Sequence, residues 1–132
     1  MVDLKEGTIS YSSAGHPAPI SVRLGKSQIL PISKGKANPA LGLIPKATYT
    51  AEKVQLDDVD RLLLITDGLH EVENSDKEQL ELEGVQAAFQ ASHADDLETS
   101  LDKVIESALA HSESGEFDDD VCLFAIEVGS GL

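Results

Sequence analysis

Asp67 is the first residue whose position in the sequence suggests chemistry. It follows residues 62–66, a short apolar run (Leu-Leu-Leu-Ile-Thr) that is typical of a buried strand, and Gly68 comes directly after it. A carboxylate at the end of a buried strand, beside a flexible glycine, is well placed to bind a hard cation or to handle phosphate. Because Asp-Gly is also a common tight-turn pair, this stretch by itself favours a purely structural turn over a functional site.

A second group of carboxylates lies in residues 118–120, Asp-Asp-Asp, directly before the last apolar segment of the chain. Acidic runs are commonly solvated loops. If the two apolar segments are neighbouring strands, however, Asp67 and this run could reach the same metal ion. Ligands that offer only oxygen suit Mg²⁺ or Mn²⁺ rather than zinc.

The elements that would hold these residues begin with strands. Alternating apolar residues predict strands over residues 8–14, 20–24 and 28–30, which we interpret as an antiparallel meander, and a weaker strand over 49–56. Residues 33–46 are rich in Gly, Pro and Lys and predict a long connection, which in a compact domain is usually a functional loop or a flap.

Helical patterns dominate the second half of the chain. Apolar spacing predicts one helix around residues 80–89 and a second over about 96–112, with Asp95 as its cap in a capping box with Glu98. A last strand follows over residues 121–128. This order predicts an α+β fold, a mainly antiparallel sheet with two helices packed on one face.

Composition limits the classes of partner. The 132 residues suffice for one domain, and 10 basic against 24 acidic residues give a net charge of −14, which argues against nucleic acid and anionic membranes as partners. No apolar run is long enough for a transmembrane helix and no signal peptide is visible, so we expect a cytoplasmic protein. Cys122, the single cysteine, lies in an apolar run and is expected to be a small core residue.

Four motifs, taken in chain order, resemble a known family. They are Ser-Ala-Gly-His-Pro-Ala-Pro at residues 13–19, Pro-Ala-Leu-Gly-Leu at 39–43, Leu-Ile-Thr-Asp-Gly-Leu-His-Glu at 64–71 and Asp-Asp-Val-Cys-Leu at 119–123. Together they resemble the sporulation stage II E and sigma-regulator phosphatases, bacterial relatives of the metal-dependent protein phosphatase 2C family. The resemblance spans nearly the whole chain and implies a partial protein phosphatase 2C-like α-β-β-α sandwich.

The resemblance also implies an activity and a site. The activity is hydrolysis of phosphoserine or phosphothreonine by water that two Mn²⁺ or Mg²⁺ ions activate, without a covalent phosphoenzyme. Asp67 and Asp119 match the family's ligands of one metal, with Gly68, Asp120 and Glu71 as supporting candidates. No catalytic residue beyond the metal ligands is expected. The Ala-Gly-His motif is expected to shape a junction between a strand and a loop.

Two departures from the family pattern modify these expectations. Cys122 replaces a threonine, and the Gly-Asp motif that supplies the family's bridging aspartate occurs nowhere in the chain. Residues 1–132 therefore resemble the C-terminal portion of a phosphatase domain. Such a portion would leave an apolar sheet face uncovered, so we expect either self-association or pairing with the N-terminal half of the domain. We also expect little or no phosphatase activity from this chain alone.

Two functions remain open from the sequence. The first is part of a phosphatase that acts on a phosphorylated bacterial signalling regulator, such as an anti-sigma-factor antagonist. The second is a non-catalytic, phosphatase-like interaction module. A phosphoacceptor receiver domain is disfavoured, because that fold requires alternating strands and helices, whereas strands dominate the first half of this chain.

Overall fold

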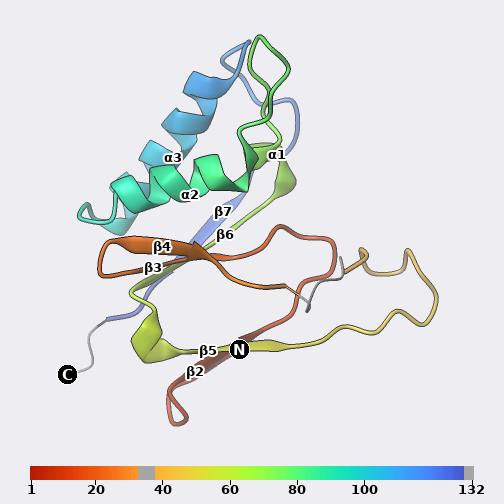
Figure 1. The fold of residues 1–132 in the computed structure, drawn as a ribbon, viewed down its shortest axis with the longest axis vertical. Helices are drawn as coiled ribbons and strands as arrows, with labels where there is room; N and C mark the ends of the chain where they lie inside the picture. Colours follow the sequence, from red (N-terminus) through yellow and green to blue (C-terminus); the bar gives the residue numbers. More distant parts are fainter. Residues whose placement is uncertain (33–37, 130–132) are drawn as a thin grey trace.

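Two antiparallel sheets form the framework of the computed structural model, which describes residues 1–32 and 38–129 (Figure 1). The smaller sheet has the strand order β1-β2-β5 and contains β1 (Val2–Asp3), β2 (Thr8–Tyr11) and β5 (Glu52–Gln55). The larger sheet has the order β4-β3-β6-β7 and contains β3 (Ile20–Arg23), β4 (Lys26–Ile29), β6 (Arg61–Ile65) and β7 (Leu123–Glu127).

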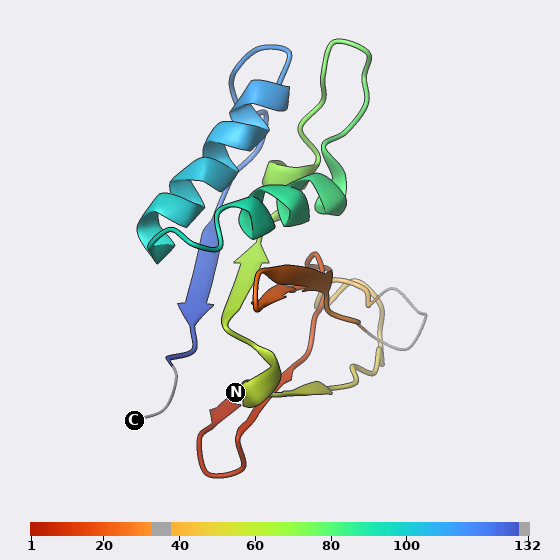
Figure 2. The ribbon, with the colours of Figure 1, turned by 60° about the vertical axis from the view of Figure 1, so that its left-hand side comes forward.

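Two helices, α2 (Glu81–Ala91) and α3 (Leu97–His111), cover one face of the larger sheet, as Figure 2 shows. A single-turn helix, α1 (Asp67–His70), follows β6, and a 3₁₀ turn, η1 (Leu56–Asp58), precedes it. The α+β class, with antiparallel strands and two helices on one sheet face, is therefore confirmed.

Alternation along β6 assigns its side chains to two apolar clusters. Leu63 and Ile65 face the helices, whereas Leu62 points to the opposite face, toward the smaller sheet. Full burial of one such side chain stabilises the fold by about 1.5–3 kcal/mol. The helix-side cluster also contains Ile20, Val22, Leu69, Val85, Phe89, Val104 and Ala108, and the second cluster contains Ile9, Leu30 and Val59.

The predicted meander is wrong in the pairing of its first two strands, whereas the pairing of its second strand with its third, β3 with β4, is confirmed. β2 pairs with β1 and β5, so that Ile9 lies opposite Val54, whereas β3 pairs with β4 and β6, so that Ile20 lies opposite Leu63. The loop between β2 and β3 crosses from one sheet to the other. Local alternation predicts that a segment is extended, but it carries no information about which distant segment becomes its partner.

The start of α3 differs from the prediction by one residue. Asp96, not Asp95, caps the helix: its Oδ1 accepts a hydrogen bond from the Thr99 backbone N–H at 2.9 Å, and its Oδ2 accepts one from the Thr99 hydroxyl at 2.7 Å. Asp95 instead forms an ion pair with Lys103 at 2.7 Å. The hydrogen bonds from Thr99 lower the pKa of the Asp96 carboxyl below its ordinary value.

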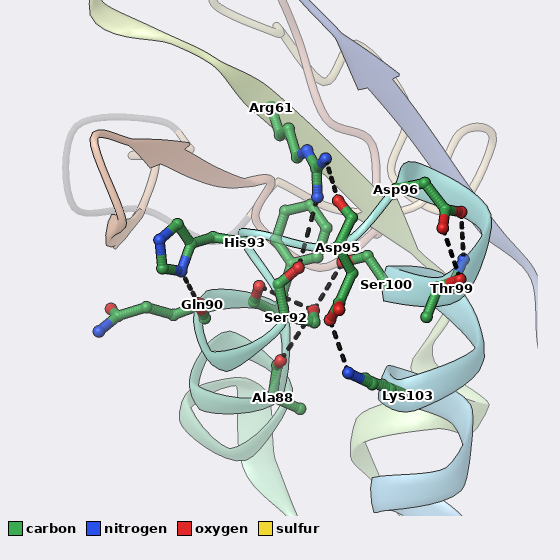
Figure 3. Close-up of polar contacts among 11 residues, drawn as sticks. Arg61, Ala88, Gln90, Ser92, His93, Asp95, Asp96, Thr99, Ser100 and Lys103 are labelled. Atoms are coloured by element: carbon green, nitrogen blue, oxygen red, sulfur yellow. Dashed lines mark hydrogen bonds and ion pairs between the residues drawn. The ribbon is translucent and has the colours of Figure 1, made fainter.

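Arg61, at the start of β6, fastens the turn between α2 and α3 to the sheet (Figure 3). Its guanidinium donates hydrogen bonds to the carbonyl oxygens of Asp95 at 2.5 Å and Ser92 at 3.5 Å, and it forms an ion pair with Glu127 of β7 at 2.7 Å. Beneath it, the hydroxyls of Ser92 and Ser100 join the two helices at 2.6 Å. The buried side chains of Arg61, Ser92 and Ser100 are thus paired at the end of the sheet opposite to Asp67.

Part of the predicted connection over residues 33–46 lies outside the described residues, namely residues 33–37. Residues 38–51 contain turns but no regular helix or strand. Within the described part of the chain, no helix is long and apolar enough to cross a membrane.

Candidate metal centre

Asp67 lies where β6 passes into α1. Thr66 is still extended (φ −92°, ψ 163°), and the helical turn begins with Asp67, whose carbonyl accepts a hydrogen bond from the Glu71 N–H at 3.0 Å. The Asp67 side chain is exposed, and its Oδ1 accepts a hydrogen bond from the Gly68 N–H at 3.2 Å. The change from strand to turn therefore brings this carboxylate out of the core.

Asp119 lies in the segment that leads into β7. Its side chain is exposed, and its Oδ1 accepts a hydrogen bond from the Asp120 N–H at 2.7 Å. Among the residues that the structure describes, neither Asp67 nor Asp119 forms an ion pair. Both carboxylates are therefore available to a cation from solvent.

Pairing of β6 with β7 brings the two acidic motifs together. The antiparallel ladder ends with Ile65 opposite Leu123, and one further backbone hydrogen bond joins the Thr66 N–H to the Cys122 carbonyl at 3.1 Å. Gly68 then lies against the other motif: a Cβ atom added to it would be 2.6 Å from the Asp120 carbonyl oxygen. The strand that Asp67 follows and the strand that residues 118–120 precede are therefore neighbours, as predicted.

A hollow of about 280 Å³ lies beside this contact and is lined mainly by polar residues. Of the residues predicted from the sequence, Gly68, Glu71 and Asp119 line it, whereas Asp67 and Asp120 do not. Its remaining lining residues are Val72, Glu73, Gln79 and Asp118. The structure thus brings only part of the predicted set to one hollow.

Glu73 and Gln79 belong to a hairpin that the sequence analysis missed. They form an antiparallel bridge, and the Asn74 side chain accepts hydrogen bonds from the backbone N–H groups of Asp76 and Glu78. Asn and Asp at such spacing are typical of turns, and this signal could have predicted the hairpin.

The hairpin is fastened to the end of α3. His111 Nε2 lies 3.0 Å from the Glu78 carbonyl oxygen, and Lys77 forms an ion pair with Glu113 at 2.9 Å. The hydrogen bond to Glu113 raises the pKa of the Lys77 ammonium above its ordinary value. One wall of the hollow is therefore held by residues from two distant parts of the chain.

The carboxylate oxygens at this site are suitable ligands for a hard cation, but they form an open site. Carboxylate oxygens are the ligands that Mg²⁺ and Mn²⁺ prefer. Within residues 1–32 and 38–129, no group of three or more His, Cys, Asp or Glu side chains is arranged to hold a metal. A cation bound by Asp67 and Asp119 would therefore keep most of its coordination for water or for other ligands.

The expectation that Cys122 is a core residue is wrong, because its side chain is exposed. Leu123 and Ala125 pack against the helix-side cluster, so alternation turns Cys122 and Phe124 to the opposite face. Its backbone N–H donates a hydrogen bond to the Thr66 hydroxyl at 2.9 Å.

The Ala-Gly-His motif lies in the loop that connects the two sheets. Gly15 has a left-handed conformation (φ +81°), and a Cβ atom added to it would lie 3.0 Å from Ala40, so this loop packs against the Pro-Ala-Leu-Gly-Leu segment. The Ser13 hydroxyl donates a hydrogen bond to the His16 carbonyl at 2.9 Å, while the His16 side chain is exposed.

A second hollow, of about 360 Å³, separates this loop from the face of β6 and β7 that points away from the helices. Leu64 and Phe124 lie opposite each other on this face and remain 38% and 57% exposed. The hollow also reaches Thr66 and Cys122, so it adjoins the candidate metal centre.

Comparisons with known proteins agree with this arrangement. The sequence profile of the family described as Stage II sporulation protein E (SpoIIE) matches residues 1–129. Protein IcfG of Synechocystis sp. is 24% identical over 126 residues, which cover 96% of this chain and 19% of that protein. The solved structure of the RsbU and RsbW domains of Rv1364c from Mycobacterium tuberculosis superposes with a TM-score of 0.73 and 22% identity, over 92% of this chain and 32% of that chain.

These findings confirm the family resemblance and the fold. The chain spans about a fifth of the IcfG sequence and about a third of the solved chain, so both relatives contain much that has no counterpart here. Since the family match extends over almost all of the sequence, the chain belongs to the SpoIIE family of protein phosphatase 2C-like phosphatases.

Proposed function

We propose that this chain is the metal-binding, C-terminal portion of a serine/threonine protein phosphatase domain. The observation that carries the proposal is the contact between the Thr-Asp-Gly and Asp-Asp motifs, in which Gly68 packs against the backbone of Asp119 and Asp120. In this proposal Asp67 and Asp119 hold a Mn²⁺ or Mg²⁺ ion, and Gly68, Asp120 and Glu71 support them.

The exposure of both carboxylates favours a reaction on a large substrate. Divalent cations at such sites lower the pKa of bound water and neutralise charge on phosphate oxygens. The residues of this chain would contribute the two ligands and an accessible hollow beside them, lined by Glu71 and Asp119. A phosphoserine or phosphothreonine on a protein surface could reach such an open site.

Family membership supports a substrate among bacterial signalling regulators, such as an anti-sigma-factor antagonist. The solved neighbour, which carries RsbU and RsbW domains in one chain, is compatible with a signalling role. We expect little phosphatase activity from residues 1–132 alone, because the chain contains no Gly-Asp motif to supply a bridging carboxylate.

A non-catalytic interaction module is the second candidate. The observation that favours it is the lack, among the described residues, of a group of three potential metal ligands. The two candidates differ in whether Asp67 and Asp119 bind a cation at all.

We further propose that another protein surface covers the face of β6 and β7 that points away from the helices, which we call the outer face. Leu64 and Phe124 expose apolar area beside the hollow of about 360 Å³. Exposed apolar patches of this kind mark interaction sites. The occupant would be a second copy of the chain or the N-terminal half of a phosphatase domain.

The test of the metal centre is Mn²⁺ titration by calorimetry on the chain and on the double variant Asp67→Asn, Asp119→Asn. The matched control is Asp57→Asn, Asp102→Asn, which changes the net charge equally at two exposed positions in η1 and α3. We expect saturable binding to the chain and to the control, and its loss in the double variant.

Binding that survives in the double variant would place the cation elsewhere and contradict the metal centre. No binding to the chain itself would favour the non-catalytic module. A decrease of equal size in the control would attribute the effect to net charge rather than to coordination.

A further inference from the structure

Thr66 occupies the N-cap position of α1, but its side chain does not cap that helix. Threonine at this position usually accepts a hydrogen bond from the first helical turn. Here the hydroxyl points across to the neighbouring segment instead. It donates a hydrogen bond to the Asp120 carbonyl at 3.0 Å and accepts one from the Cys122 N–H at 2.9 Å.

These contacts continue the pairing of β6 and β7 beyond the last ladder pair, Ile65 with Leu123. The Thr66 N–H adds a third hydrogen bond, to the Cys122 carbonyl at 3.1 Å. One residue therefore makes three hydrogen bonds to the short segment that follows Asp119, two of them through its hydroxyl.

The position of Thr66 links these bonds to the two carboxylates. Thr66 directly precedes Asp67, and the acceptor residue Asp120 directly follows Asp119. Loss of the hydrogen bond between the Thr66 hydroxyl and the Asp120 carbonyl would thus affect the backbone next to each carboxylate. Beyond the ladder, Gly68 packs on the same segment but supplies no hydrogen-bonding side chain.

We propose that Thr66 is a positioning residue of the metal centre, whose hydroxyl fixes the Asp119 segment relative to Asp67. This inference rests on the proposed function, because it assumes that both carboxylates bind one cation. Residues that orient metal ligands through hydrogen bonds contribute to affinity without touching the ion.

The test compares Thr66→Val, which keeps the shape but removes the hydroxyl, with Thr66→Ser, which keeps the hydroxyl. Thr48→Val makes the same chemical change at an exposed position and serves as the control. Amide hydrogen exchange without metal reports the Cys122 N–H directly, and Mn²⁺ titration reports the two carboxylates.

We expect the Cys122 amide to exchange faster in Thr66→Val and at nearly the rate of the unchanged chain in Thr66→Ser. Mn²⁺ affinity should fall about tenfold or more in Thr66→Val, recover in Thr66→Ser and stay unchanged in Thr48→Val. Thr66→Ala, which also lacks the hydroxyl, decides the question if the valine variant does not fold.

Unchanged Mn²⁺ affinity in Thr66→Val, together with faster exchange at Cys122, would show a purely structural contact and overturn the inference. A loss of affinity in Thr66→Ser equal to that in Thr66→Val would overturn it too, because the hydroxyl would then not be the cause. Failure of the proposed function gives a different result: the unchanged chain itself would bind no Mn²⁺.

Discussion

Gly68 allows the close approach between the two acidic motifs. A Cβ atom at this position would lie 2.6 Å from the Asp120 carbonyl oxygen and 3.1 Å from the Asp119 carbonyl carbon, both of them backbone atoms. We therefore expect Gly68→Ala to push the Asp119 segment away from α1. Such overpacking should lower the free energy of unfolding by about 1–3 kcal/mol, and Mn²⁺ affinity should fall about tenfold or more.

Gly129→Ala is the matched control for this substitution, since a Cβ atom at Gly129 meets nothing within 4 Å. Urea unfolding measures stability, and calorimetry measures affinity for Mn²⁺. If Gly68→Ala retained both the stability and the affinity of the unchanged chain, the close packing of the two motifs would be irrelevant to the site.

For single residues, the sequence predicts which segments lie near one another better than it predicts the direction in which a side chain points. Asp67 and the acidic run could be associated because each adjoins an apolar segment of strand length. The apolar segment that contains Cys122 predicts a core position for it, yet alternation turns its side chain to the exposed face. Glu73 was not predicted because its place beside the hollow depends on a hairpin fastened to the distant end of α3.

The cap of α3 gives a prediction at the scale of an element. Hydrogen bonds from Thr99 lower the pKa of Asp96 in the folded chain. A carboxyl group whose folded pKa is lowered stabilises the fold above its unfolded pKa, and this contribution is lost as the pH falls through the folded pKa. Asp96→Ala should therefore lower Tm by a few degrees at pH 7, and the difference from the unchanged chain should shrink as the pH falls below the ordinary carboxyl pKa of 3.8 and through the lower pKa of the folded chain.

Two further variants separate capping from charge. Asp96→Asn retains a side-chain acceptor for Thr99 but does not titrate, and Asp102→Ala removes an exposed carboxylate from the middle of α3. Asp60, whose pKa is lowered chiefly by a hydrogen bond from the Leu24 N–H, titrates in every variant, so its effect cancels in the comparison. A Tm difference for Asp96→Ala that stays constant with pH would contradict the linkage.

The elements themselves were largely predictable, because periodicity is a local property. Both long helices and the strand before Asp67 lie close to their predicted positions. The pairing of β2 with β5 and that of β3 with β6 were not predictable, because each strand and its partner are far apart in the sequence. The cap of α3 was misplaced by one residue because Asp95 and Asp96 offer the same side chain, and only the geometry of the turn selects between them.

At the scale of the whole molecule, the outer face of β6 and β7 and the high negative charge act against each other. Leu64 and Phe124 present apolar area, whereas a net charge of −14 makes copies of the chain repel one another. Salt shortens the Debye length from about 10 Å at 0.1 M to about 3 Å at 1 M. Added salt would therefore weaken the repulsion between copies of the chain, so that burial of the apolar outer face would decide whether they associate.

Self-association of the chain should consequently strengthen with salt. We expect light scattering to give an average mass that rises toward that of a dimer as NaCl increases, and Leu64→Thr with Phe124→Thr to return it to the monomer. Leu41→Thr with Leu43→Thr, at loop positions that are 77% and 71% exposed, removes comparable apolar side chains elsewhere and should not change the mass. A monomer at every salt concentration would contradict self-association and would favour the N-terminal half of a phosphatase domain as the occupant of this face. Association that persists in the Leu64 and Phe124 variant would place the contact on another surface.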